Sequence, residues 1–240
     1  MDIPKMYSRE VRLIGAEAFE KLSDSKVMIC GLGGVGGGAL EALARAGVGT
    51  LVLVDNDTVD ETNLNRQLVA INDFVGKPKT EAAKKRVLDI RPLDKNNIVT
   101  ENLFITRENA RALLEKHIPD YVIDAIDNVS AKIALAVYCE ELGIPLISSM
   151  GTGNKLNPAE LAVSDIYKTD TCPLARVMRR ELKARGVKSL KTVWSREIPR
   201  TPVTDDSSPD VSRTPASVSF VPPVAGMIIA SEVVKDICGL

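Results

Sequence analysis

The sequence is poor in the residues on which several kinds of protein chemistry depend. Among its 240 residues there is one histidine, His117, and the four cysteines form no Cys-x-x-Cys pair. The absence of paired cysteines argues against a zinc ribbon and against a secreted scaffold held by disulfides. A single histidine leaves no assured Ser–His or Cys–His catalytic unit. With four Phe, four Tyr and one Trp, recognition of single-stranded RNA through many stacked bases is not expected.

Long apolar runs and an excess of one charge are also missing. No run reaches the roughly 18 apolar residues that span a bilayer, and the first ten residues carry charge without the apolar core of a signal peptide. We therefore expect a cytoplasmic protein with no stable membrane insertion. Lys and Arg number 31 against 32 Asp and Glu, a net charge of −1. This balance excludes a uniformly basic nucleic-acid-binding protein but leaves room for a local basic patch.

What is present predicts an α/β fold. Apolar residues make up 45% of the chain and charged residues 26%, as in ordinary globular proteins. Apolar runs typical of buried strands occur at residues 26–30, 51–54, 97–101, 121–126 and 145–148, and helices are predicted at residues 39–46, 80–90 and 130–142. This alternation predicts βαβ units in a doubly wound, mainly parallel, Rossmann-like sheet with helices on both faces.

The pattern changes after residue 150. Further strands, which we expect to be antiparallel, are predicted at residues 161–163, 192–197 and 217–221, and helices at residues 173–185 and 223–237. Residues 201–216 are rich in Pro, Ser, Thr and Asp and are predicted to form a mobile loop. We therefore predict one domain over residues 1–240, with a core at 1–150 and a short antiparallel C-terminal extension at 151–240.

A glycine-rich turn follows the first predicted strand and precedes the first helix of the core. Gly31, Gly33, Gly34 and Gly36 allow a tight turn and a close approach of the backbone to a phosphate, which the helix N-terminus also attracts. Asp55 ends the next predicted strand, 24 residues after Gly31, where a carboxylate can accept hydrogen bonds from a ribose. The order of these features predicts a nucleotide site; the alternative is that the glycines only permit close packing.

Polar residues beyond Asp55 favour a nucleoside triphosphate over a dinucleotide. Arg66 can fork onto phosphate oxygens, and Asn65 can donate a hydrogen bond to them. Lys79, beside a predicted helix start, can meet another phosphate, and Asp127, at the carboxyl end of a strand, can hold Mg²⁺. Asp57 fits either this site or a turn cap.

Four segments together resemble the ThiF/MoeB family. They are GLGGVG (31–36), DNDTVDETNLNRQ (55–67), GKPK (76–79) and DAIDN (124–128). The resemblance implies a ThiF-type ATP-binding domain that uses ATP and Mg²⁺ to adenylate a carboxylate with release of pyrophosphate. It implies catalytic roles for Arg66, Lys79, Asp127 and Arg9, the last supplied by the second subunit of a homodimer; the alternative for Arg9 is a solvated N-terminal charge. The nucleotide contacts that it implies are Gly31, Gly33, Gly34, Gly36, Asp55, Asp57, Asn65, Arg66, Lys79, Asp127 and Asn128.

Two further segments, at residues 168–186 and 219–234, resemble one branch of the family, the tRNA threonylcarbamoyladenosine dehydratases. The family's activators of sulfur-carrier proteins have two Cys-x-x-Cys pairs that bind zinc, and this chain has none, so we expect no zinc. Cys172 fits an ordinary cysteine beside Pro173 better than a catalytic or persulfide cysteine. The resemblance also implies a cysteine desulfurase or sulfur-acceptor system as a partner.

The last notable feature of the sequence is a basic segment. Between residues 176 and 200 there are nine basic and two acidic residues, a local net charge of +7. Such a segment can dock on the phosphates of tRNA, and the alternative is a solvated helix face. The candidate contacts are Arg176, Arg179, Arg180, Lys183, Arg185, Lys188 and Lys191.

The expected function is ATP-dependent dehydration, by cyclisation, of N6-threonylcarbamoyladenosine in tRNA. Two alternatives stay open: adenylation of the C-terminal glycine of a ubiquitin-like sulfur carrier, and nucleotide binding by a non-catalytic adapter. The presence of Asn65, Arg66, Lys79 and Asp127 argues against the adapter. An NAD-dependent dehydrogenase is the least favoured reading, because no acid or base for hydride transfer stands out.

Overall fold

A seven-stranded sheet in the order β3-β2-β1-β4-β5-β7-β6 forms the centre of the computed structural model, which describes residues 3–91, 97–203 and 215–240. The strands are β1 (Lys26–Cys30), β2 (Thr50–Asp55), β3 (Ile98–Asn102), β4 (Tyr121–Asp124), β5 (Leu146–Ser149), β6 (Leu161–Asp165) and β7 (Lys191–Ser195). All neighbouring pairs are parallel except β6 and β7. The predicted doubly wound, mainly parallel fold is confirmed.

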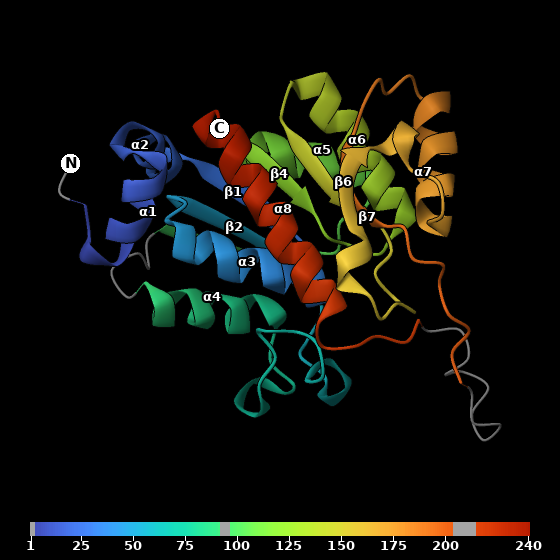
Figure 1. Cartoon of the computed structure of the whole chain (residues 1–240), viewed down its shortest axis with the longest axis horizontal. Helices are drawn as coiled ribbons and strands as arrows, with labels where there is room; N and C mark the ends of the chain where they lie inside the picture. Colours follow the sequence, from blue (N-terminus) through green and yellow to red (C-terminus); the bar gives the residue numbers. More distant parts are fainter. Residues whose placement is uncertain (1–2, 92–96, 204–214) are drawn as a thin grey trace.

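Helices cover both faces of the sheet (Figure 1). They are α1 (Ser8–Ile14), α2 (Ala16–Asp24), α3 (Gly34–Ala46), α4 (Lys79–Ile90), α5 (Arg107–His117), α6 (Val129–Leu142), α7 (Pro173–Ala184) and α8 (Val221–Cys238). Because side chains alternate along a strand, Val27 and Ile29 of β1 pack with α3 and α8, whereas Met28 and Cys30 pack with α5 and α6. The central strands β1 and β2 therefore carry apolar side chains on both faces, as the sequence indicates.

The C-terminal part departs from the sequence prediction in two places. The strand predicted at residues 192–197 is β7, which is parallel to β5 and antiparallel only to β6. The strand predicted at residues 217–221 is wrong, because these residues run without regular structure into α8 at Val221. Pro222 and Pro223 occupy the first turn of α8, where a missing N–H costs no hydrogen bond. Most of the loop predicted at residues 201–216 lies outside the described residues.

Helix α8 connects the end of the chain to the core. It runs diagonally across α3 in Figure 1, and the two helices pack at very short range. A Cβ atom on Gly226 would lie 2.1 Å from the carbonyl oxygen of Val35, and one on Gly38 would lie 2.5 Å from that of Pro223. Only glycine at these positions allows the backbones to approach so closely. Among the helices in the described ranges, none is both long and apolar enough to cross a membrane.

Candidate nucleotide-binding site

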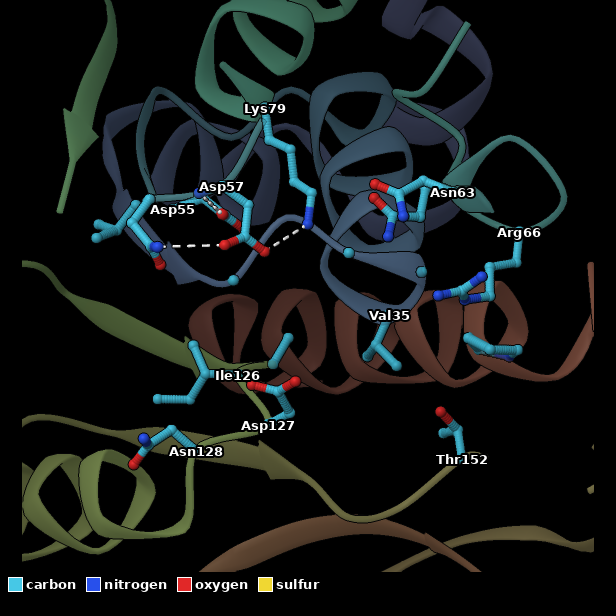
Figure 2. Close-up of a pocket in the computed structure, with 18 of the residues that line it drawn as sticks. Val35, Asp55, Asp57, Asn63, Arg66, Lys79, Ile126, Asp127, Asn128 and Thr152 are labelled. Atoms are coloured by element: carbon cyan, nitrogen blue, oxygen red, sulfur yellow. Dashed lines mark hydrogen bonds and ion pairs between the residues drawn. The ribbon is translucent and has the colours of Figure 1, made fainter. Parts of the chain in front are cut away.

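A cavity of about 420 Å³ lies at the carboxyl ends of β1, β2 and β4. Its walls come from the glycine turn after β1, the segments that follow β2 and β4, and residues from the C-terminal part of the chain (Figure 2). The strand order reverses between β1 and β4, and open α/β sheets bind ligands at such a switch point. The topology therefore creates a crevice where the sequence predicts a nucleotide.

The glycines of the turn serve two different purposes. Gly31 has φ +90°, and Gly31, Gly33 and Gly34 line the cavity. A Cβ atom on Gly36 would lie 1.8 Å from the carbonyl oxygen of Gly31. Gly36 does not line the cavity, and its lack of a side chain lets α3 start against the turn. The first turn of α3 thus directs N–H groups of the backbone at the cavity, which favours an anion.

Asp55 ties the glycine turn to the end of β2. Its Oδ2 accepts a hydrogen bond from the backbone N–H of Leu32 at 2.6 Å, and its Oδ1 accepts one from that of Asp57 at 2.8 Å. The side chain also lines the cavity. Each carboxylate oxygen can accept more than one hydrogen bond. Asp55 can therefore support the turn and still bind a ribose hydroxyl.

Lys79 and Asp57 form an ion pair at the cavity wall, drawn in Figure 2. Lys79 is the first residue of α4, its side chain is 8% exposed, and its Nζ lies 2.8 Å from Oδ2 of Asp57, whose side chain is 58% exposed. The buried ammonium is held by a carboxylate that water also reaches. Lys77, two residues earlier, is exposed and lies over the ring of Phe74 instead of lining the cavity.

Arg66 lines the cavity, but Asn65 does not. The guanidinium of Arg66 donates hydrogen bonds to the carbonyl oxygen of Thr62 and to Oδ1 of Asn65, both at 2.8 Å. The Nδ2 of Asn65 donates to the carbonyl oxygen of Ser217 at 3.2 Å. Asn65 thus orients the arginine and connects it to the segment before α8. Asn63, two residues before Asn65, does line the cavity and is 8% exposed.

Asp127 and Asn128 follow β4 and both line the cavity. The carboxylate of Asp127 points into the space below the glycine turn in Figure 2. The Oδ1 of Asn128 accepts a hydrogen bond from the backbone N–H of Ala131 at 3.0 Å, so this side chain caps α6. Asp127 is therefore the acidic side chain that is best placed for a metal ion brought by a phosphate.

Several cavity residues were not among those predicted from the sequence. Gln67 follows Arg66 directly, is 6% exposed, and its Oε1 is the one buried side-chain polar atom of the described residues that has no hydrogen-bond partner. A buried acceptor of this kind is normally satisfied, so a ligand or water is expected beside it. Thr152, Gly153, Pro215 and Ser217 line the opposite wall. Nothing in the local sequence marks these four as part of the site.

Arg9 does not line the cavity of its own chain. It is exposed on α1, next to Tyr7, which packs against Gly47 at the C-terminal end of α3. The cavity lies at the N-terminal end of α3, whose 13 residues span roughly 20 Å at about 1.5 Å per residue. Arg9 is thus at the far end of this helix from the cavity.

Most basic residues of the basic segment are exposed, and some of them are engaged in contacts within the chain. Lys191 is half-buried and its Nζ lies 2.7 Å from Asp236, while Arg179 donates to the carbonyl oxygen of Thr169 at 2.8 Å. These two are less suited to bind tRNA than the sequence suggests. The residues exposed along and just after α7 are Arg176, Arg180, Lys183, Arg185 and Lys188, of which Arg180 and Arg185 also pair with Glu181. Opposite them Ala175, Met178 and Leu182 are buried, so α7 turns its charged face outward.

The start of α7 lies close to the cavity. Cys172 is the residue just before this helix, and its Sγ would lie 3.7 Å from a Cβ atom on Gly151, which directly precedes the cavity residues Thr152 and Gly153. All four cysteines are buried and free. Burial raises the pKa of the Cys30 thiol well above its usual value and raises that of Cys139 to about 12.

Within residues 3–91, 97–203 and 215–240 no cluster of three His, Cys, Asp or Glu residues suits a metal ion. That the protein binds no zinc stays a prediction.

Comparison with known proteins agrees with this arrangement. The tRNA threonylcarbamoyladenosine dehydratase of Bacillus subtilis (strain 168) is 42% identical over 241 residues, which cover 96% of this chain and 94% of that protein. The crystal structure of the Escherichia coli tRNA N6-threonylcarbamoyladenosine dehydratase TcdA in complex with ATP superposes with a TM-score of 0.87 at 32% identity, covering 98% of this chain and 94% of that one. The molybdopterin-synthase adenylyltransferase of E. coli is 39% identical over 144 residues, 59% of this chain and 56% of that protein.

The family comparison covers nearly the whole chain. Residues 7–240 match the ThiF family, so the match includes the glycine turn, the cavity residues on both walls, the basic helix α7 and the C-terminal helix α8. The resemblance found in the sequence motifs is thereby confirmed. The chain belongs to the ThiF family.

Proposed function

We propose that this protein is an ATP-dependent dehydratase that cyclises N6-threonylcarbamoyladenosine in tRNA. The observation that carries this proposal is the combination of 42% identity to the B. subtilis dehydratase over 96% of the chain with the close fold match to ATP-bound TcdA. The similarity to a molybdopterin-synthase adenylyltransferase covers only 59% of the chain. Because the proposed substrate is a tRNA, we also propose a cytoplasmic location.

ATP fits the chemistry of the cavity. The backbone N–H groups at the start of α3 can bind phosphate oxygens, and Asp55 can accept hydrogen bonds from the ribose. Lys79 and Arg66 would offset the negative charge of the β- and γ-phosphates. Leu103, Phe104 and Ile105, which follow β3, supply apolar surface for the base.

Mg²⁺ fits the donor set as well. Protein sites for this ion commonly provide one or two carboxylates and leave the remaining positions to water and substrate phosphates. Asp127 is such a carboxylate, exposed on the cavity wall beside the proposed phosphate position. When bound, the ion would neutralise charge that develops on the phosphates as the α-phosphorus is attacked.

The proposed reaction has two steps. The carboxylate of the threonyl group attacks the α-phosphorus of ATP, which forms an acyl-adenylate and releases pyrophosphate. The carbamoyl group of the same nucleoside then attacks the activated carbonyl, loses a proton and expels AMP, so that the net change in the nucleoside is loss of water. The second step needs little from the protein because the nucleophile is tethered beside its target. Arg66 and Lys79 serve the first step, where charge develops on the phosphates.

We further propose that the protein acts as a homodimer in which Arg9 reaches the cavity of the partner subunit. Arg9 is exposed and lies at the opposite end of α3 from the cavity of its own chain, which supports a role in the cavity of another copy. A second copy would then complete the positive charge around the triphosphate. A cysteine desulfurase or sulfur-acceptor system stays a predicted partner.

The first test is to measure AMP and pyrophosphate formed from ATP and Mg²⁺ with tRNA that carries the threonylcarbamoyl group, and with the same tRNA lacking it. We expect release only with the modified tRNA, because only that tRNA presents the carboxylate to be activated. Equal release with both tRNAs, or none with either, would contradict the proposed substrate. Pyrophosphate exchange that instead requires a small ubiquitin-like protein ending in Gly-Gly would identify a sulfur-carrier activator.

The exposed face of α7 is proposed to bind the tRNA backbone. Replacing Arg176, Arg180 and Lys183 together by glutamate is expected to weaken tRNA binding and to lower the slope of log affinity against log salt by roughly two to three, since each lost phosphate contact contributes about 0.9. Filter binding over a salt series measures both. The control makes the same charge change away from α7, with Lys84 and Lys85 of α4 and Arg107 of α5 replaced by glutamate. An equal loss in both variants would show that net charge, and not α7, determines binding.

A further inference from the structure

A fully buried ion pair lies beneath the loop that carries Asp127. Asp124 is the last residue of β4 and Lys132 lies in the first turns of α6; both side chains are 0% exposed, with 2.9 Å between Nζ and Oδ2. Removing two charges from water is costly, and well-packed apolar residues would often be as stable in their place. The proposed reaction uses neither group. The pair therefore calls for an explanation other than stability.

Each member of the pair also makes a hydrogen bond to the backbone of Ile126. The Nζ of Lys132 donates a hydrogen bond to the carbonyl oxygen of Ile126 at 3.1 Å, and Oδ1 of Asp124 accepts one from the backbone N–H of Ile126 at 3.3 Å. Ser148, in the neighbouring strand β5, donates to Oδ2 of Asp124 at 2.6 Å. The ion pair thus holds both polar backbone groups of Ile126, and the adjacent strand holds the pair.

Ile126 connects the buried ion pair to the cavity. Ile126 directly precedes Asp127, and both line the cavity (Figure 2). The loop between β4 and α6 is fixed on one side by the bond from the N–H of Ala125 to the carbonyl oxygen of Cys30, at 2.8 Å, and on the other by the cap that Asn128 makes on α6. Asp127 itself lies between these points, and its side chain is exposed. The orientation of its carboxylate then depends on the backbone of Ile126, whose carbonyl is held by Lys132 and whose N–H is held by Asp124.

We propose that Lys132 and Asp124 are positioning residues that hold the two peptide groups on either side of Ile126, so that the carboxylate of Asp127 faces the Mg²⁺ bound with ATP. This inference rests on the proposed function, because it requires magnesium-bound ATP in the cavity. Groups that orient a metal-binding side chain usually change metal affinity or activity by about 10–100-fold when they are removed. The pair should therefore affect the contribution of magnesium to nucleotide binding more than binding of the nucleotide itself.

The variants must separate this role from folding. A single replacement would leave one buried charge unpaired, so the main variant combines Asp124→Leu with Lys132→Met, which removes both charges and keeps similar volumes. Ser148→Ala is a milder variant that leaves the ion pair in place. The matched control is Glu41→Gln, because Glu41 is 8% exposed and its Oε2 lies 2.8 Å from Nε of Arg86, yet it does not line the cavity. Circular dichroism and thermal melting identify the variants that fold.

The measurement is calorimetric titration with the α,β-methylene analogue of ATP, whose α–β bond cannot be cleaved, with and without MgCl₂. The wild-type protein and Glu41→Gln should bind the analogue more tightly when Mg²⁺ is present. In the double variant, the increase in affinity that Mg²⁺ brings should be smaller by about tenfold or more. Its affinity for the magnesium-free analogue should stay within about twofold of wild type. Ser148→Ala should lose less of the gain than the double variant.

Asp127→Ala separates failure of this inference from failure of the proposed function. If Asp127→Ala loses the magnesium gain but the folded double variant keeps it, the positioning role is wrong and the proposed Mg²⁺ site stands. If Asp127→Ala keeps the gain, the proposed Mg²⁺ site is itself wrong, and the positioning role fails with it. If the double variant does not fold, a full magnesium gain in Ser148→Ala overturns the inference and a reduced gain supports it.

Discussion

Lys79→Met is expected to lower the rate of AMP formation with modified tRNA by about 10²–10³-fold, the usual loss when one charge-stabilising donor is removed from an active site. The ammonium of Lys79 is nearly buried at the cavity wall, where water screens its attraction to a phosphate only weakly. Its partner Asp57 is 58% exposed, so water can solvate that carboxylate once the lysine is gone. The fold should survive, and the loss should lie in the reaction with ATP.

Lys77→Met is the matched control for this prediction. It removes the same charge two residues away, from a side chain that is exposed over Phe74 and does not line the cavity. We expect its rate of AMP formation to stay close to that of the wild-type protein. Single-turnover measurements at saturating ATP, together with a thermal melt of each variant, make the comparison. Similar rates for the two variants would contradict the role assigned to Lys79.

Asp127→Ala is expected to reduce magnesium-dependent AMP formation by about 10³-fold or more, because a catalytic metal ion commonly supplies several kcal/mol of charge stabilisation in the transition state. The carboxylate is exposed in the cavity, and within the parts of the chain that the structure describes it makes no hydrogen bond or ion pair. Its removal therefore breaks no packing. We expect an unchanged melting temperature and a severe loss of turnover.

Asp73→Ala serves as the control for this second prediction. Asp73 is also an exposed aspartate, but it lies in the turn Asn72–Phe74 and does not line the cavity. AMP formation over a MgCl₂ series should be normal in this variant and should stay low at every concentration in Asp127→Ala. Near wild-type turnover of Asp127→Ala at ordinary MgCl₂ concentrations would remove this residue from the proposed site.

The main elements of the site could be predicted because each depends on a short stretch of sequence. A glycine turn between a buried strand and a helix has few possible conformations, so Gly31, Gly33 and Gly34 had to lie near the carboxyl end of β1. Asp55 and Asp127 lie at or just beyond the ends of parallel strands, which meet at the same edge of the sheet. For these residues, a position at the end of a strand is enough to predict that they lie at the carboxyl edge of the sheet.

Other parts of the site depend on geometry that has no local signature. Asn63 and Asn65 are two residues apart in the same motif, and the short helical turn Glu61–Asn63 decides that Asn63 lines the cavity while Asn65 supports Arg66. Whether a glycine lines the site or only permits packing, as Gly36 does, depends on which atoms lie opposite its missing Cβ. Which asparagine and which glycines line the cavity is therefore decided by the three-dimensional arrangement of the chain.

The sequence alone determined the alternation of strands and helices, the glycine turn, the order of the acidic and basic residues along the motifs, and thus the family and the general location of the nucleotide. The tertiary structure decided which residues from the second half complete the cavity. Thr152, Pro215 and Ser217 reach it because β7 joins the sheet beside β5 and α8 returns across α3. The structure also decided that Lys191 is held by Asp236, and that Asp124 and Lys132 meet beneath Asp127. The physical reason is that local conformation and hydrophobic periodicity depend on neighbouring residues, whereas these contacts join residues that only packing of distant elements brings together.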